Sequence, residues 1–137
     1  MRERYCHVAW VNGCFDVLHR GHIELLKWAS KKGDYLIVGI DSDSRVKELK
    51  GESRPLHSQD DRKFILESLK CVNEVVIFGS DIELEQIIKH RQVDTIIVGE
   101  EYKNQRVIGH RPELGLHFFP KVNGYSTTKI IEDSSAW

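Results

Sequence analysis

The segment from Asn12 to His22 constrains this chain more than any other, and it reads Asn-Gly-Cys-Phe-Asp-Val-Leu-His-Arg-Gly-His. The apolar run Val8–Val11 precedes it, and a helical pattern of apolar residues follows it. These patterns predict a strand, a glycine-bearing turn and then a helix. Free backbone N–H groups at the start of that helix, together with the positive end of its dipole, favour a bound polyphosphate.

Two histidines, His19 and His22, stand where this helix begins, with Gly21 between them. A spacing of three places both on one helix face if both are helical. Their imidazoles offer donors that can carry positive charge, and glycine lets a ligand approach the backbone closely. The alternatives are two solvated surface histidines or a zinc site with Cys14, which lacks a recognisable fourth ligand. We predict phosphate-binding histidines.

Composition bounds the class of protein. The 137 residues are 40% hydrophobic and 30% charged, with a net charge of -1, which suits one globular domain without overall attraction to nucleic acid or anionic membrane. The three cysteines are irregularly spaced, which favours a reducing compartment over a disulfide framework. No long apolar stretch or signal peptide is visible. We expect a cytoplasmic protein that binds neither nucleic acid nor membrane.

Strand-like apolar runs alternate with helical patterns along the chain, which predicts an α/β fold. We expect one Rossmann-like domain over residues 1–137, with a five-stranded parallel sheet and helices on both faces. Its ligand should bind beyond the carboxyl ends of the strands. The expected strands are 7–11, 35–40, 74–78, 94–98 and 116–119, and the expected helices are 21–32, 58–71, 81–91 and one that starts at Ser126.

Three details refine this prediction. Ser58 should cap the second helix, with Phe64, Ile65 and Leu69 facing inward, and Ser80 or Asp81 should cap the third. Residues 99–113 lack clear periodicity and are a candidate lid, because long loops of this kind are usually functional.

Two further segments accompany the first motif: residues 47–56, Lys-Glu-Leu-Lys-Gly-Glu-Ser-Arg-Pro-Leu, and residues 124–131, Gly-Tyr-Ser-Thr-Thr-Lys-Ile-Ile. Together the three resemble the signature of the cytidylyltransferase-like nucleotidyltransferases. That family includes glycerol-3-phosphate cytidylyltransferase and the adenylyltransferase domain of the bifunctional heptose synthesis enzymes. The motifs occur in the family's order and span nearly the whole chain.

The resemblance implies attack by a substrate phosphate on the α-phosphorus of a nucleoside triphosphate, with release of pyrophosphate. Such a reaction needs in-line positioning and charge stabilisation rather than a protein nucleophile. Mg²⁺ is expected to arrive with the triphosphate, and the sequence shows no all-protein cage for it, as is usual for this ion. Relatives are commonly dimers, so a homodimer is expected by analogy.

The resemblance also implies roles for individual residues. The expected catalytic residues are His19, His22 and Lys50. The expected nucleotide-binding residues are Gly13, Cys14, Phe15, His19, His22, Arg62, Gly99, Glu100, Tyr102, Ser126 and Thr127. The expected substrate-binding residues are Asp16, Lys50, Arg54 and Lys121.

Some of these residues also have a structural interpretation. Phe15 is expected to pack under the turn, and Asp16 either orders the loop or helps a metal site. Arg62 either reaches toward the active site or forms a surface pair with a neighbouring acid on its helix. Ser126 caps a helix in either case.

The wording of the motifs favours the heptose branch of the family. The first motif differs from the Gly-Thr-Phe-Asp form of the glycerol phosphate enzymes, and together with residues 50–56, Lys-Gly-Glu-Ser-Arg-Pro-Leu, it resembles the heptose branch. The glycerol phosphate enzymes also carry arginine where Lys121 stands, and lysine keeps the charge but loses the bidentate fork. We therefore expect ATP and a sugar phosphate such as heptose 1-phosphate as substrates, in an enzyme without the sugar kinase often fused to this domain. The alternatives are CTP with glycerol 3-phosphate or another polyol phosphate, an FAD-synthase-like adenylyltransferase, a non-catalytic nucleotide-binding module, and a flavodoxin-like carrier.

Overall fold

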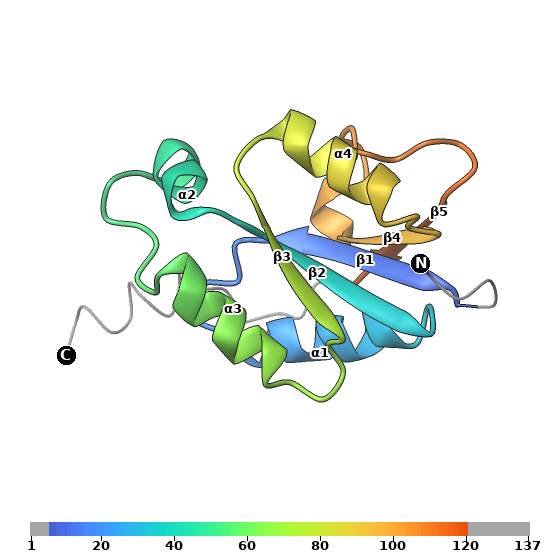
Figure 1. The fold of residues 1–137 in the computed structure, drawn as a ribbon, viewed down its shortest axis with the longest axis horizontal. Coiled ribbons are helices and arrows are strands. Elements are labelled where there is room, and N and C mark those ends of the chain that lie inside the picture. Colours follow the sequence, from blue (N-terminus) through green and yellow to red (C-terminus); the bar gives the residue numbers. More distant parts are fainter. Residues whose placement is uncertain (1–5, 121–137) are drawn as a thin grey trace.

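Five parallel strands form one sheet in the order β3-β2-β1-β4-β5 (Figure 1). The computed structural model describes residues 6–120. The strands are β1 (Val8–Gly13), β2 (Tyr35–Asp41), β3 (Glu74–Phe78), β4 (Thr95–Gly99) and β5 (Gly115–Phe119). The sheet grows outward from β1 first through β2 and then, on the other side, through β4. The strand order therefore reverses between β1 and β4, where α/β sheets bind their ligands.

Helices cover both faces of the sheet, which confirms the predicted Rossmann-like fold. The helices are α1 (Arg20–Ser30), α2 (Asp43–Lys50), α3 (Gln59–Glu67) and α4 (Asp81–His90), and a 3₁₀ turn, η1 (Glu100–Tyr102), follows β4. In Figure 1, α1 and α3 lie on one face of the sheet and α4 lies on the other, while α2 lies beyond the carboxyl end of β2. No helix within residues 6–120 is long and apolar enough to traverse a bilayer.

Each face of the sheet has its own apolar core. On one face, Leu26 of α1 and Leu66 of α3 pack against the strands. On the other, Leu84 and Ile88 of α4 pack with Trp10, which is fully buried. Strands covered on both faces need apolar side chains in both directions, which explains why they read as continuous apolar runs.

Serine side chains cap the N-termini of three helices. Ser58 accepts the backbone N–H of Asp61 at 3.1 Å, which confirms the predicted cap of α3. Ser80 rather than Asp81 caps α4, and Ser42 caps α2 in the same way. Each bond satisfies an N–H group that the first helical turn leaves without a partner.

Two sequence-based expectations are wrong. Phe64 and Ile65 do not face inward, because their exposed fractions are 71% and 38%. Leu66 and Arg62 are buried instead, and α3 ends at Glu67, although Leu69 does pack against the core as predicted. The helix α2, which includes residues 47–50, has no counterpart among the predicted helices.

Truncating the core side of α4 should cost far more stability than truncating its outer side. Ile88 is 1% exposed and Ile82 is 69% exposed on the same helix. We expect Ile88→Ala to lower the free energy of unfolding by about 2–5 kcal/mol, because it leaves a cavity. Ile82→Ala should change it by no more than about 0.5 kcal/mol. Urea denaturation compares the two, and similar losses would contradict this packing.

Candidate functional site

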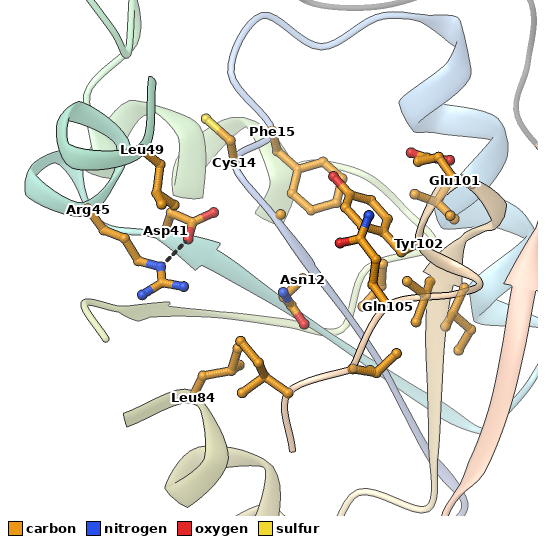
Figure 2. A pocket seen from close by; sticks show the side chains of 18 of the residues that line it. Asn12, Cys14, Phe15, Asp41, Arg45, Leu49, Leu84, Glu101, Tyr102 and Gln105 are labelled. Atoms are coloured by element: carbon orange, nitrogen blue, oxygen red, sulfur yellow. Dashed lines mark hydrogen bonds and ion pairs between the residues drawn. The ribbon is translucent and has the colours of Figure 1, made fainter. Parts of the chain in front are cut away.

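A cavity of about 480 Å³ opens at the carboxyl ends of β1 and β4. Its walls are the turn after β1, residues of α2, and the loop after β4. Figure 2 shows Arg45 and Leu49 of α2 on one side and Tyr102 and Gln105 on the other. The volume is in the range of sites that enclose small ligands, and the position matches the switch in strand order.

The turn after β1 adopts backbone conformations that side chains disfavour. Phe15 and Val17 have φ angles of 52° and 49°, in the left-handed region. Such angles persist only where the surroundings enforce them. The Phe15 ring is 6% exposed and lies 5.4 Å from the ring of His22, so it packs under the turn as expected.

Asp16 connects this turn to the loop between α2 and α3. Its side chain is buried, and its two carboxylate oxygens accept the backbone N–H groups of Leu56 and His57 at 2.7 and 2.9 Å. The Nε atom of Arg54 lies 3.5 Å from the same carboxylate. Of the two roles that the sequence left open for Asp16, these contacts favour ordering of the loop.

Arg62 of α3 likewise holds neighbouring segments together through hydrogen bonds. Its side chain is 1% exposed, so of the two alternatives left open for Arg62 the surface pair is wrong. It donates to the carbonyl oxygens of Cys14, Asp41 and His57 at 2.9, 2.8 and 3.1 Å, and to the Asp43 carboxylate at 2.8 Å. Arg62 does not line the cavity, and these bonds make it a positioning residue for three segments around it.

His19 and His22 form a reciprocal cap at the start of α1. The backbone N–H of His19 donates to Nδ1 of His22 at 3.2 Å, and the backbone N–H of His22 donates to Nδ1 of His19 at 3.4 Å. The two rings stack with their centroids 3.8 Å apart. Because each Nδ1 accepts, each neutral ring carries its proton on Nε2. His22 lines the cavity and can present its Nε2–H there, whereas His19 is not among the residues that line it.

These histidines are neutral donors. Burial, followed by the neighbouring His19 and Lys50, lowers the pKa of His22 to about 4. Burial also lowers the pKa of His19. The sequence suggested imidazoles that carry positive charge, but at neutral pH these lowered pKa values leave both rings uncharged. The cations that line the cavity beside them are lysine and arginine side chains.

Lys50 and Arg54 are the predicted cations of this site, and both line the cavity. Lys50 is exposed at the last position of α2, and Gly51 then turns the chain with a φ of 102° that favours glycine. The Arg54 side chain is 11% exposed, and its Nε and Nη2 atoms are buried without a hydrogen-bond partner. A buried guanidinium with unused donors is suited to an anionic ligand.

Of the nucleotide-binding residues predicted after β4, Gly99 and Tyr102 line the cavity and Glu100 does not. Burial, and then the charges of Glu101 and Asp41, raise the pKa of Tyr102. The tyrosine hydroxyl therefore stays protonated at neutral pH and can donate to a ligand.

The structure also adds residues that the sequence did not single out. Asn12, Asp41 and Arg45 line the cavity. The Trp10 Nε1–H donates to Oδ1 of Asn12 at 2.9 Å, which orients that amide. The position of Asn12 and Asp41 at the carboxyl ends of β1 and β2 was the available signal, whereas nothing in the sequence marked Arg45.

Two remaining expectations concern other parts of the chain. Lys121, Ser126 and Thr127 lie outside the described residues, so their roles stay predictions. Among residues 6–120, no three histidine, cysteine, aspartate or glutamate side chains are grouped as metal ligands, so the zinc alternative has no structural support.

Cys14 and Gly13 also line the cavity. Burial raises the pKa of the Cys14 thiol, which favours an unreactive cysteine at this position.

Comparison with known proteins agrees with this geometry. Residues 10–133 match the family described as cytidylyltransferase-like. The chain belongs to this nucleotidyltransferase family. A bifunctional protein HldE from Helicobacter pylori (strain J99) is 42% identical over 125 residues, which are 91% of this chain and 27% of that protein. HldE from Campylobacter concisus is 45% identical over 125 residues, 91% of this chain and 26% of that protein.

The chain therefore spans about a quarter of the length of the curated relatives it matches. Among solved structures, a lipopolysaccharide core biosynthesis protein from Thermoplasma volcanium has a TM-score of 0.70 at 24% identity, covering 86% of this chain and 99% of that one. A pantoate-beta-alanine ligase from Francisella tularensis has a TM-score of 0.64 at 16% identity, covering 98% of this chain and 71% of that one. Both likenesses support the fold.

The lowered pKa of His22 predicts a pH-dependent stability. The folded chain has a His22 pKa of about 4 against 6.5 for the free side chain, so between these values the unfolded chain binds the extra proton. The free energy of unfolding should therefore fall as the pH is lowered from about 6.5 to about 4. His22→Gln, which cannot titrate, should reduce this slope in urea denaturation series.

The matched control for this experiment is His90→Gln, at an exposed histidine near the end of α4, outside the cavity. The change in slope for His22→Gln is compared with that for this variant, which also removes one imidazole. Equal slopes for His22→Gln and the wild-type chain would contradict the assignment of a neutral, buried imidazole.

Proposed function

We propose that this chain transfers AMP from ATP to a sugar phosphate such as heptose 1-phosphate and releases pyrophosphate. The observation that carries the proposal is the Nε2–H donor of His22 at the N-terminus of α1, which lines one cavity together with Lys50 and Arg54. A neutral donor, helix N–H groups and two cations together match a triphosphate.

In the proposed reaction, an oxygen of the acceptor phosphate attacks the α-phosphorus. The bond from that phosphorus to the bridging oxygen of the β-phosphate breaks, and pyrophosphate leaves with the electron pair. Negative charge grows on the transferred and leaving groups, so prearranged donors lower the barrier without a protein nucleophile. His22 and Lys50 are the residues we assign to this stabilisation, and His19 orients His22 through the reciprocal cap.

Mg²⁺ is part of this proposal, as the ion that accompanies the triphosphate. Among residues 6–120 no three candidate metal ligands are grouped, and both carboxylate oxygens of Asp16 accept backbone N–H groups. This arrangement fits an ion bound chiefly through phosphate oxygens and water, which is common for Mg²⁺. When bound, it would neutralise phosphate charge.

The heptose branch is supported by 42–45% identity to the HldE proteins over most of this chain. Residues 50–55, Lys-Gly-Glu-Ser-Arg-Pro, resemble the same branch. In the structure this segment contributes Lys50 and Arg54 to the cavity, so the residues that distinguish the branch lie at the proposed acceptor side. A homodimer remains a prediction from family analogy, and a cytoplasmic location remains a prediction from the composition.

Pyrophosphate release tests the proposal directly. ATP and CTP are each combined with heptose 1-phosphate and with glycerol 3-phosphate in the presence of Mg²⁺. We expect turnover only with ATP and heptose 1-phosphate. Turnover only with CTP and glycerol 3-phosphate would contradict the branch assignment, and tight ATP binding without turnover would favour a non-catalytic module.

Removing the Nε2–H donor of His22 should slow the chemical step. We expect His22→Ala to lower kcat by about 100- to 1000-fold, the usual effect of losing one donor to a developing charge. Nucleotide affinity, measured by calorimetry, should change much less. His90→Ala is the control because His90 lies outside the cavity. Full turnover by folded His22→Ala would contradict the role assigned to this residue.

A further inference from the structure

Asp41 and Arg45 form a rigid pair in the wall of the cavity opposite Tyr102 (Figure 2). The Nε atom of Arg45 donates to Oδ1 of Asp41 at 2.7 Å, and its Nη2 atom donates to Oδ1 of Asp81 at 2.6 Å. The guanidinium also lies 5.3 Å from the centre of the Phe78 ring. Both members of the pair are largely buried, with side-chain exposures of 16% and 13%, so their orientation is set before a ligand arrives.

The pair retains one donor and one acceptor for a ligand. Within the described part of the chain, Nη1 of Arg45 and Oδ2 of Asp41 make no hydrogen bond or ion pair. The positive charge of Arg45 is shared between two carboxylates, so this end of the cavity has no excess positive charge for a phosphate. A hydroxyl group both donates and accepts, and it therefore matches the pair.

The cavity is divided by charge along α2. Lys50 is five residues after Arg45 on the same helix, which is about 7.5 Å along its axis. Lys50, which makes no ion pair among the described residues, supplies the cationic end, where Arg54 beside Asp16 adds unused donors. Asp41 and Arg45 supply the neutral, polar end. A ligand with a phosphate at one end and hydroxyl groups a sugar ring away fits this division better than a three-carbon polyol phosphate does.

We propose that Asp41 and Arg45 form a hydroxyl-binding subsite that recognises the sugar of a phosphorylated sugar acceptor. The proposal rests on the nucleotidyltransferase function proposed above. It assigns specificity for the acceptor to a pair that is separate from the histidines and from Lys50. The pair contacts the bound sugar and takes no part in proton or phosphoryl transfer.

Calorimetry of acceptor binding tests the subsite without relying on turnover. The protein is saturated with α,β-methylene ATP and Mg²⁺, and then titrated with heptose 1-phosphate or glycerol 3-phosphate. Arg45→Gln should weaken binding of heptose 1-phosphate by about 10- to 100-fold, the usual effect of losing a charged hydrogen bond. Binding of glycerol 3-phosphate and of the nucleotide should be unchanged.

Two further variants separate the subsite from a general loss of structure. Asp41→Asn keeps an oxygen for Arg45 but replaces an acceptor with a donor, so it should weaken heptose 1-phosphate binding in the same direction. Arg91→Gln is the matched control, because Arg91 pairs with Glu74 at the first residue of β3, away from the cavity. It should leave both acceptors and the nucleotide bound as in the wild-type chain.

The outcomes distinguish this proposal from the one on which it rests. Equal heptose 1-phosphate affinity in the wild-type chain and Arg45→Gln would overturn the subsite alone. Equal weakening of nucleotide and acceptor in Arg45→Gln would also overturn it, since the pair would then support the whole site. Nucleotide binding by the wild-type chain without any binding of heptose 1-phosphate would overturn the proposed acceptor, and the subsite with it.

Discussion

Two buried charges, on Asp16 and Arg62, hold together the segments from which the site is built. A charge removed from water is costly unless hydrogen bonds replace its hydration, and here the backbone supplies them. Asp16 accepts two N–H groups of the loop before α3, and Arg62 donates to three carbonyl oxygens and one carboxylate. Charge-assisted bonds of this kind are stronger than neutral ones. They connect the turn after β1, the end of β2 and the loop that carries Arg54.

In this site, different residues provide the fixed geometry and the positive charge. The histidines cap α1 with each other, which holds their protons on Nε2 and their rings in place. Their lowered pKa values make them neutral donors, while Lys50 and Arg54 supply positive charge nearby. A donor whose orientation is set in advance needs no reorganisation as charge develops, which is the property that phosphoryl transfer demands.

The sequence predicted the sheet because strands buried on both faces must be apolar throughout, and it predicted the phosphate turn because the motif from Asn12 to His22 is specific. It did not predict α2, since only Val46 of that helix is buried and no apolar period results. The predicted inward face of α3 is wrong because an arginine, Arg62, occupies an interior position of this helix, and its partners are distant in sequence. The sequence did not single out Arg45 for the same reason, because its partner Asp81 lies 36 residues away.

A crystal structure with α,β-methylene ATP would test the central claim most directly. The account predicts that the triphosphate lies against the N-terminus of α1, with Nε2 of His22 within hydrogen-bond distance of a phosphate oxygen and Lys50 beside it. It also predicts that the base lies beside Gly99 and Tyr102, at the carboxyl end of β4. A triphosphate bound elsewhere, or a His22 ring turned so that Nδ1 faces the phosphates, would contradict it.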